Sequence, residues 1–377
     1  MKFTCLQENL EKALSLINRT AIFKSQLPIT TNVFLKATKE GIEIVGTDLE
    51  NTTRVVLLGK IEKEGGILLP IRTFIETVNA LPKENVTIEV AELAATITSG
   101  RYKVKINGIS EAEFPQLPKA PDKKKMEVGE LLSYSKIITF AASSDESRGT
   151  LTGILVISSG KDTMLVATDG YRLSLKKIKG ERDKGEGESE EEKIIIPSRV
   201  FAEVAKIAGE RGKSEEGKEE VSLVIKETNN QVVFAFKDVE IHSRLIEGEF
   251  PAYGKIIPQS FETRAVFDRE EFTKAVKLSS IFARDSANIV KVKIGKESMI
   301  LSANATQVGE NTCEVEAAIE GDENEIAFNS RFLLEFLAAI DSKEIAFEMT
   351  GPLNPGVFKI PGDDSYFHII MPVRVQG

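Results

Sequence analysis

A strand followed by an arginine and an amphipathic helix occurs three times along this chain, and this repeat constrains the fold more than any other feature. Each copy reads as an apolar strand, a short turn, an arginine and a helix-forming stretch. The three copies are Ile67–Ile75, Ile194–Ala202 and Ile326–Leu334. Arg72 precedes Arg199 by 127 residues, and Arg199 precedes Arg331 by 132. In a chain of 377 residues this period predicts three similar domains.

Other elements keep the same phase and define the fold of each unit. Each unit is expected to open on a helix, at Leu6–Thr20, Val128–Ala142 and Asp268–Ala283. Alternating apolar and polar residues with short connections predict antiparallel strands around these helices. The sequence therefore predicts an α+β fold of three repeated domains, each with antiparallel sheets and two helices. We expect the domains at residues 1–121, 122–253 and 254–377.

Composition limits the compartment in which the chain works. No apolar run approaches the length of a membrane span. The segment Met1–Cys5 leads directly into a strand pattern and lacks the basic start and apolar core of an export signal. For the two distant cysteines, Cys5 and Cys313, free core thiols are favoured over a disulfide. We therefore expect a cytoplasmic protein.

Few residues are available for metal or nucleophilic chemistry. The two histidines, His242 and His368, both lie in apolar strand patterns, and a buried strand histidine is the favoured interpretation of each. No Cys/His cluster for zinc is present, and we expect no metal and no cofactor. Asp48 and Asp169 follow strands at equivalent places in the repeats, which favours turn-forming carboxylates. A metal-dependent nuclease that uses these two residues and Asp285 is the enzymatic alternative.

Charge gives two contrasting indications about nucleic acid. The net charge of −9 argues against binding to phosphates, which usually needs a basic surplus. Two runs rich in Gly and Glu, 180–192 and 209–220, hold much of the acid and are typical of solvated loops. The net charge therefore says little about any one face of the molecule.

The predicted helices carry basic residues on the face opposite their apolar stripe. The first stripe is Leu6, Leu10, Ala13, Leu14 and Ile17 with Lys12 and Arg19 opposite, and the second is Ile71, Phe74, Val78 and Leu81 with Arg72 and Lys83 opposite. Similar positions recur at Arg199, Lys206, Lys274 and Lys277. An ordinary solvated face explains any one of them, and acids share these faces. Their recurrence on several helices favours an anionic ligand.

Several motifs in register resemble one known family. The most distinctive are Thr168–Leu173 (TDGYRL) and Met371–Val375 (MPVRV), and the others are Met1–Phe3, Leu27–Ile29, Gly46–Glu50 and Phe250–Tyr253. Together they span the chain in order, and the chain closely resembles the beta subunit of bacterial DNA polymerase III, the sliding clamp. The resemblance implies a head-to-tail homodimer closed into a ring, with helices lining a central hole around double-stranded DNA.

The same resemblance implies a processivity factor without catalytic activity of its own. Its partners would be the replicative DNA polymerase alpha subunit, a clamp loader, and other polymerases and repair proteins, which bind through short linear peptides. A sliding ring must not read bases, so its DNA contacts should be exchangeable contacts to phosphates. The alternative is a three-repeat scaffold that binds proteins and does not encircle DNA.

The resemblance also implies three sets of site residues. Lys24 and Arg72 match positions at which the family touches DNA, and Arg148, Arg199 and Lys206 extend that set. The family's peptide-binding cleft maps onto Thr168, Gly170, Tyr171, Arg172, Leu173, Pro251, Lys255, Ile256, Ile369, Met371, Pro372, Val373 and Arg374. At the dimer interface, Val104 and Ile106 would pack against Ile281 and Phe282 of the second subunit.

Two of these segments have an ordinary explanation without the resemblance. Met371–Val375 reads as a C-terminal edge strand that contains a proline. Arg101–Ile106 reads as a free edge strand that its lysines protect from pairing.

Overall fold

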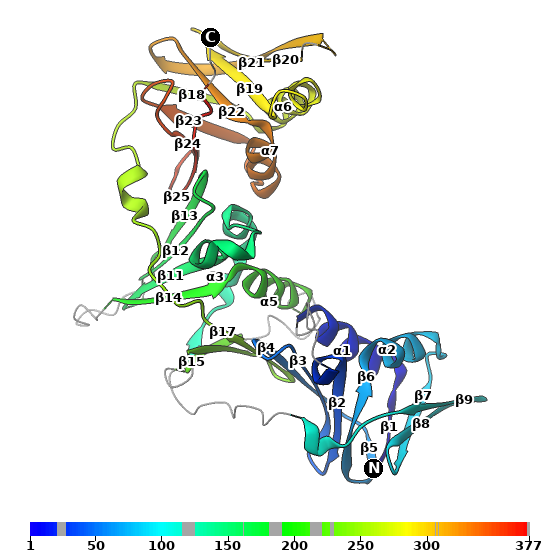
Figure 1. The fold of residues 1–377 in the computed structure, drawn as a ribbon. Helices are drawn as coiled ribbons and strands as arrows, with labels where there is room; N and C mark the ends of the chain where they lie inside the picture. The colour runs from blue at the N-terminus through cyan, green and yellow to red at the C-terminus, as the bar shows by residue number, and fades with distance from the viewer. Residues whose placement is uncertain are drawn as a thin grey trace. The chain divides into compact units, whose positions relative to one another are not determined.

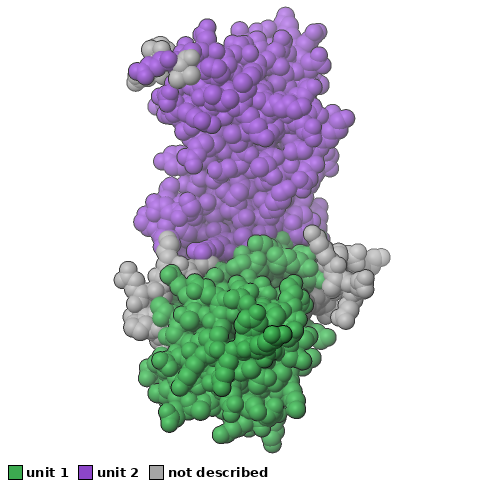
Figure 2. All heavy atoms as spheres, turned by 90° about the vertical axis from the view of Figure 1, so that its right-hand side faces the viewer, with its two compact units in different colours: residues 1–132, 203–245 green, residues 133–202, 246–377 purple. Residues whose placement is uncertain are grey.

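The computed structural model describes residues 1–20, 28–114, 125–160, 162–180, 191–211, 221–226, 230–305, 307 and 309–374. These residues form two compact units, one of residues 1–132 with 203–245 and the other of residues 133–202 with 246–377 (Figures 1 and 2). The second repeat contributes to both units, because its strands continue the sheets of both neighbouring repeats. Strand β17 (Val239–Arg244) pairs with β4 (Asn51–Leu57) in the first unit. Strand β13 (Arg172–Ile178) pairs with β25 (Asp363–Ile370) in the second.

The described part of the first unit contains two antiparallel sheets, two complete long helices and most of a third. Its strands are β1 Lys2–Leu6, β2 Asn32–Thr38, β3 Gly41–Thr47, β4, β5 Lys60–Lys63, β6 Gly65–Pro70, β7 Asn85–Ala91, β8 Ala94–Ser99, β9 Tyr102–Asn107, β10 Lys125–Glu127, β15 Ser222–Lys226, β16 Gln231–Ala235 and β17. One sheet has the order β5-β1-β7-β8-β9 and the other β10-β15-β16-β17-β4-β3-β2-β6. Helices α1 (Gln7–Thr20) and α2 (Ile71–Ala80) pack against each other and against these sheets (Figure 1).

Helices α1 and α2 bury nearly the same apolar stripes that the sequence predicts. Helix α2 buries Ile71, Phe74 and Val78, and Leu81 just beyond its end is buried as well. Helix α1 buries its predicted stripe from Leu10 onward. The prediction was wrong for Leu6, which is exposed and ends β1. The pairing of β1 with β7 extends to this residue, so the helix begins one residue later.

The second unit contains one continuous sheet of twelve strands with helices packed on it. Its strands are β11 Gly153–Ser159, β12 Asp162–Thr168, β13, β14 Glu192–Pro197, β18 Thr263–Asp268, β19 Ile289–Ile294, β20 Ser298–Ala305, β21 Gly309–Gly321, β22 Asn324–Asn329, β23 Glu344–Met349, β24 Gly356–Ile360 and β25. The strand order is β14-β11-β12-β13-β25-β24-β23-β18-β21-β20-β19-β22. Helices α6 (Arg269–Ala283) and α7 (Ser330–Ala339) pack against each other, and α6 also lies against β20 and β21.

Two of the predicted opening helices have different outcomes. Helix α6 begins as predicted, because the Asp268 side chain accepts hydrogen bonds from the backbone N–H groups of Glu270 and Glu271. The continuous helix predicted over Val128–Ala142 was wrong. The segment forms α3 (Gly129–Ser133), α4 (Ser135–Ile138) and a 3-10 turn, η3 (Thr139–Ala141). Serine and threonine side chains compete for helix backbone groups, and the Thr139 hydroxyl donates to the Ser135 carbonyl at 2.9 Å.

The repeated junction of strand, arginine and helix is present in all three copies. Strands β6, β14 and β22 each lead directly into a helix: α2, α5 (Ser198–Arg211) and α7. Arg72, Arg199 and Arg331 are each the second residue of that helix, and all three are exposed. In the third copy the Asn329 side chain accepts a hydrogen bond from the Arg331 N–H at 3.0 Å and so caps α7.

The histidines and Cys5 lie where the sequence predicts, whereas Cys313, expected in a core, is only half-buried. His242 in β17 and His368 in β25 are buried strand residues. Cys5 and Cys313 are free thiols, and burial raises the pKa of Cys5 to about 12. No helix in the described ranges is long and apolar enough to cross a membrane.

Candidate functional site

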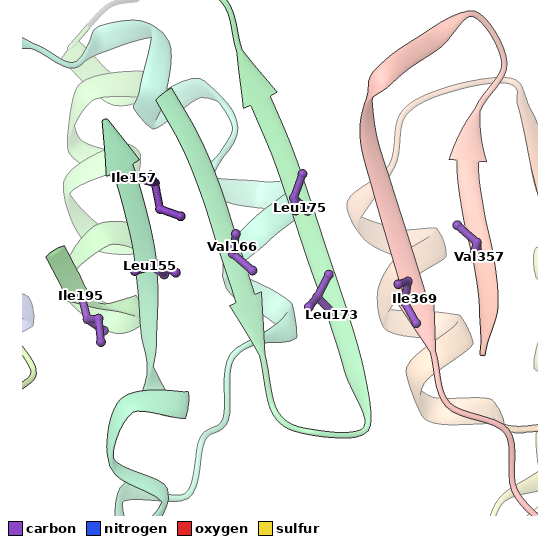
Figure 3. Packing of buried hydrophobic residues seen from close by; sticks show 8 residues of the cluster. All are labelled: Leu155, Ile157, Val166, Leu173, Leu175, Ile195, Val357 and Ile369. Carbon is purple, nitrogen blue, oxygen red and sulfur yellow. The ribbon is translucent and has the colours of Figure 1, made fainter. Parts of the chain in front are cut away.

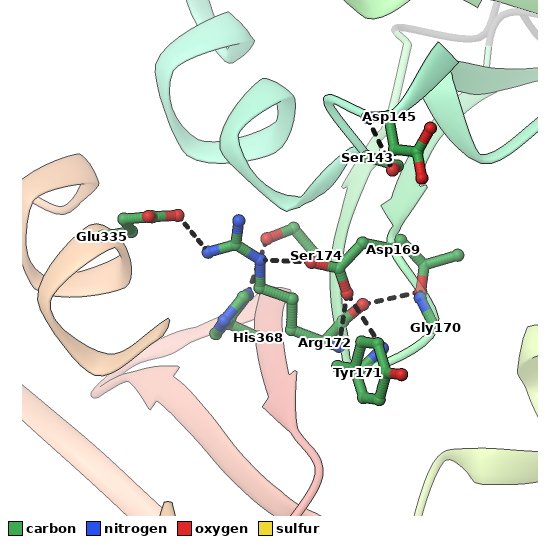
Figure 4. Close-up of polar contacts among 10 residues, drawn as sticks. Ser143, Asp145, Asp169, Gly170, Tyr171, Arg172, Ser174, Glu335 and His368 are labelled. Carbon is green, nitrogen blue, oxygen red and sulfur yellow. Dashed lines mark hydrogen bonds and ion pairs between the residues drawn. The ribbon is translucent and has the colours of Figure 1, made fainter. Parts of the chain in front are cut away.

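The turn between β12 and β13 is built by its own side chains (Figure 4). Oδ1 of Asp169 accepts the backbone N–H groups of Tyr171 at 2.9 Å and Arg172 at 3.0 Å. The Thr168 hydroxyl donates to the Arg172 carbonyl at 2.6 Å. Gly170 has φ +87°, a backbone conformation that residues other than glycine rarely adopt. Asp169 is therefore a turn-forming residue, as predicted.

Asp48 has the same role in the first repeat. Its Oδ1 accepts the N–H groups of Glu50 at 3.0 Å and Asn51 at 2.6 Å. Hydrogen bonds to the backbone therefore engage two of the three carboxylates of the nuclease alternative. The third, Asp285, is exposed in the turn after α6. Within the described residues, no group of three or more His, Cys, Asp and Glu side chains is placed to hold a metal ion.

Arg172 is held by two carboxylates and two aromatic rings. Its side chain is only 8% exposed. Its Nε donates to Asp169 at 3.0 Å and its Nη1 donates to Glu335 of α7 (Figure 4). The guanidinium carbon lies 4.7 Å from the ring centroid of Phe332 and 5.4 Å from that of Phe140. These contacts compensate the loss of hydration of a nearly buried cation.

Tyr171 exposes its ring at the surface beside this buried cation. Its exposed fraction is 59%, which is large for an aromatic residue. The ring stacks on Phe332 with centroids 6.4 Å apart and an interplanar angle of 22°. On the turn itself, a side chain at Gly170 would come within 3.2 Å of Arg148. The turn thus presents a supported aromatic surface with an arginine beside it.

A cluster of buried hydrophobic residues spans strands β14, β11, β12, β13, β25 and β24 (Figure 3). Leu173 and Ile369, both fully buried, belong to it with Leu155, Ile157, Val166, Leu175, Ile195 and Val357. The segment that joins the second and third repeats covers part of this cluster, because Phe250, Tyr253 and Ile257 pack against it. Pro251, Lys255 and Ile256 of the same segment are exposed. Leu173 and Ile369 are therefore core residues, and the exposed residues of the predicted set are the ones available for contact.

The C-terminal segment crosses the turn as irregular backbone. Strand β25 ends at Ile370 and Met371–Arg374 form no strand, so the interpretation as an edge strand was wrong for these residues. Val375 lies outside the described residues. The Met371 N–H donates to the Tyr171 carbonyl at 2.8 Å, and the Val373 N–H donates to the Ala327 carbonyl at 2.8 Å. Met371, Pro372 and Val373 stay half-buried and Arg374 is exposed. The described part of this segment therefore borders Tyr171.

His368 occupies the core next to Arg172. It is fully buried, and its ring stacks on Phe336 with centroids 4.9 Å apart. Its Nδ1 lies 2.7 Å from the Ser174 hydroxyl. Burial, and then the charge of Arg172, hold the pKa of His368 well below its usual value. The imidazole is therefore neutral at pH 7.

The residues predicted to contact DNA are not all equivalent. Arg72 on α2, and Arg199 and Lys206 on α5, are exposed. Arg148 lies on the 3-10 segment η4 (Glu146–Thr152), beside the cleft turn. Lys24 lies outside the described residues. Among the basic positions of the predicted polar faces, Arg19 forms ion pairs with Glu203 at 3.1 Å and Glu210 at 3.4 Å, which compensate its charge.

The predicted interface residues differ in exposure. Strand β9 lies at the end of its sheet, next to β8. On β9, Val104 is half-buried, whereas Ile106 is buried in the core of its own unit. Ile106 therefore has little surface left for contact with another subunit. On α6, Ile281 is 49% exposed and Phe282 is half-buried.

Phe332, Glu335 and Phe140 were missed by sequence reasoning. Phe332 and Glu335 follow the repeated arginine of α7 and read as ordinary helix residues. Phe140 lies in a segment predicted to be one continuous helix. No sequence signal shows that three elements so far apart in the chain meet at Arg172.

Comparison with known proteins gives consistent matches along the whole chain. Family models of the DNA polymerase III beta subunit match in order: the N-terminal domain at residues 1–118, the central domain at 126–252 and the C-terminal domain at 254–374. The beta sliding clamp of Staphylococcus aureus is 29% identical over 364 residues, which are 93% of each chain. The crystal structure of the DNA polymerase sliding clamp from Bacillus subtilis has a TM-score of 0.91 and 29% identity, and covers 100% of both chains. That of the beta subunit from Thermotoga maritima has a TM-score of 0.88 at 25% identity.

Proposed function

The chain belongs to the family of bacterial DNA polymerase III beta subunits, and from this membership we propose that it works as the DNA sliding clamp of a replicative polymerase. Two copies close into a ring around duplex DNA, slide without reading sequence, and tether the polymerase. The observation that carries this function is the set of three clamp-domain matches, in order, over nearly the whole chain. The chain acts as a processivity factor in the cytoplasm and has no catalysis of its own. The domain boundaries proposed from the sequence, 1–121, 122–253 and 254–377, lie close to these matches.

The ring closes by pairing of two strand edges from different subunits. Strand β9 offers one edge at the end of its sheet. Strand β21 offers the other: residues 309–316 pair with β20 on one side, and β18 takes the opposite side from Ala317 onward. Lys103 and Lys105 of β9 would meet Glu310 and Glu314 of the other subunit, so charge favours this pairing.

Apolar contacts complete the same interface. Phe282 lies close to the start of β21, because a side chain at Gly309 would come within 3.9 Å of its ring. Ile281 is exposed beside it on α6. Val104 of one subunit packs against Ile281 and Phe282 of the other. Ile106 supports Val104 from within its own unit.

The DNA-facing set consists of long basic side chains on repeated helices. Arg72, Arg199 and Lys206 are exposed, and Lys24 completes the set from the sequence motif. Such side chains make phosphate contacts that exchange easily, and enclosure rather than affinity prevents escape. Arg148 is the least direct member, because it lies beside the cleft turn.

The cleft around Tyr171 and Met371 binds short linear peptides. It takes them from the replicative DNA polymerase alpha subunit, the clamp loader, other polymerases and repair proteins. An exposed aromatic ring next to methionine, proline and valine gives an apolar surface that adapts to related peptides. Arg148, Lys255 and Arg374 are exposed cations for the polar parts of a peptide.

Primer extension tests this function. A replicative polymerase and loader from a related bacterium extend a primer on single-stranded circular DNA, with and without this protein. A clamp lengthens the products made in a single binding event. A scaffold that does not encircle DNA leaves their length unchanged.

A further inference from the structure

An ion pair joins the cleft turn to the third repeat. Glu335 lies on α7, and its carboxylate accepts a hydrogen bond from Nη1 of Arg172. Arg172 directly follows Tyr171, the exposed ring of the cleft. The other carboxylate on Arg172, that of Asp169, comes from the turn itself. Glu335 therefore links the turn to a helix 163 residues away in the sequence.

We propose that Glu335 is a positioning residue of the peptide cleft. By holding Arg172 against α7 it fixes the orientation in which Tyr171 meets an incoming apolar peptide. This inference rests on the proposed function, because it takes the cleft to be a peptide site. It adds to that function a dependence of peptide affinity on a helix of the third repeat.

Phe332 adds a second contact between helix α7 and the turn. It lies three residues before Glu335, on the same face of α7. Its ring lies 4.7 Å from the Arg172 guanidinium carbon and 6.4 Å from the Tyr171 ring. Helix α7 thus holds two successive residues of the turn, Tyr171 by stacking and Arg172 by stacking and an ion pair. Phe332 and Glu335 lie within one turn of the same helix, so their contacts with Tyr171 and Arg172 move together.

Burial makes the Arg172 end of the contact sensitive to loss of its partner. A guanidinium that is 8% exposed needs acceptors for its donors. Without Glu335, Nη1 loses an acceptor and the side chain gains by turning toward water. That rotation shifts the backbone that carries Tyr171. Glu335 is itself 45% exposed, and Arg172 regains water when it turns outward, so the net cost to the fold is small.

Peptide affinity measures the effect. The probe is a fluorescein-labelled peptide with leucine and phenylalanine anchors, followed by fluorescence anisotropy. Glu335→Ala is expected to raise Kd by up to about tenfold, because the lost hydrogen bond to a charged group stabilises the orientation of the turn that binds the peptide. Glu335→Gln should raise it less, because the amide oxygen still accepts from Arg172. The unfolding temperature should stay at the wild-type value in both variants.

Asp341→Asn is the matched control. Asp341 lies just beyond the same helix, and its carboxylate pairs with Lys136 at 2.8 Å. This pair also joins the second and third repeats, but it is exposed and does not involve the turn. The variant should keep the wild-type Kd.

A second measurement reports on orientation directly. The chain contains no tryptophan, so Tyr171→Trp introduces a single indole at the cleft. Anisotropy decay of this indole should show larger local motion when Glu335→Ala is added, and no change with Asp341→Asn.

The outcomes separate this inference from the proposed function. If the wild-type protein fails to bind the peptide, the peptide site itself is contradicted. If it binds, and Glu335→Ala changes neither Kd nor indole motion, the positioning role alone is overturned. A Kd that rises only together with a lower unfolding temperature would also overturn it, because Glu335 would then be a structural residue.

Discussion

The guanidinium carbon of Arg148 lies 5.8 Å from the centroid of the Tyr171 ring. Arg148 comes from η4 and Tyr171 from the turn after β12, so two segments of the second repeat meet at the cleft surface. The sequence suggested a DNA contact for Arg148, whereas this geometry places it against a ring that the proposed peptide would touch. The two roles predict different consequences of removing the side chain.

Arg148→Ala should weaken binding of the apolar peptide by about twofold to fivefold, because an exposed cation–π contact stabilises by roughly 0.5–1 kcal/mol. Fluorescence anisotropy measures this change, and Lys177→Ala, an exposed residue of β13, is the control. Unchanged peptide affinity with weaker retention on DNA would assign Arg148 to the DNA instead.

The DNA-facing set predicts a dependence on salt. Arg72→Ala with Arg199→Ala should lower the slope of log affinity against log salt concentration by about two, since each phosphate contact contributes roughly 0.9. Titration of short duplex DNA at several salt concentrations measures the slope. Lys296→Ala, in an exposed turn between β19 and β20, should leave it unchanged. An equal change in the control would show that only total charge matters.

One substitution at an exposed position of the proposed interface should convert the dimer into a monomer. Ile281→Asp places a charge at the proposed seam without filling or emptying a core, because Ile281 is 49% exposed. Light scattering after size exclusion should give the dimer mass for wild type and the monomer mass for the variant. Leu353→Asp is the matched control, at a leucine that is 62% exposed in the turn after β23, and it should stay dimeric. A dimeric Ile281→Asp protein would move the interface elsewhere.

His368 predicts a loss of stability in mild acid. In the unfolded chain a histidine binds a proton below pH about 6.5, whereas burial lowers the folded-state pKa of His368. The unfolded state then binds more protons, so the free energy of unfolding is highest above pH about 6.5 and falls as the pH drops below it. Urea denaturation between pH 5 and 7.5 measures this dependence, with the range set about the usual histidine pKa of roughly 6.5.

His368→Phe is the matched variant for that measurement. A phenyl ring keeps the stacking with Phe336 and removes the titrating group. The variant should lose part of the pH dependence, although it leaves the Ser174 hydroxyl without its imidazole partner. An identical pH profile in both proteins would show that other groups cause the acid sensitivity.

The repeated junctions were predictable because they are local. The period of Arg72, Arg199 and Arg331 and the stripe of α2 follow from chain geometry, and the structure has both. The Asp48 and Asp169 turns were predictable for the same reason, since each carboxylate bonds a backbone group two or three residues ahead. Short-range chemistry determines these features.

Features that depend on tertiary contacts were not predictable. The segment after Val128 reads as one helix, yet it breaks at Tyr134. The C-terminal segment reads as a strand, yet backbone bonds from Met371 and Val373 hold it as irregular chain. The ion pair between Glu335 and Arg172 joins elements that become neighbours only when the sheet folds. Motif resemblance proposed the cleft, whereas the residues that hold its turn required coordinates.

Retention on DNA of defined topology tests whether the protein encloses the duplex. The protein is loaded onto nicked circular DNA and separated from free protein by gel filtration, and the circle is then cut once. A closed ring stays on the intact circle at high salt and leaves within minutes after the cut, by sliding off the ends. Equal retention on circular and linear DNA, or dissociation from both at high salt, would contradict the account.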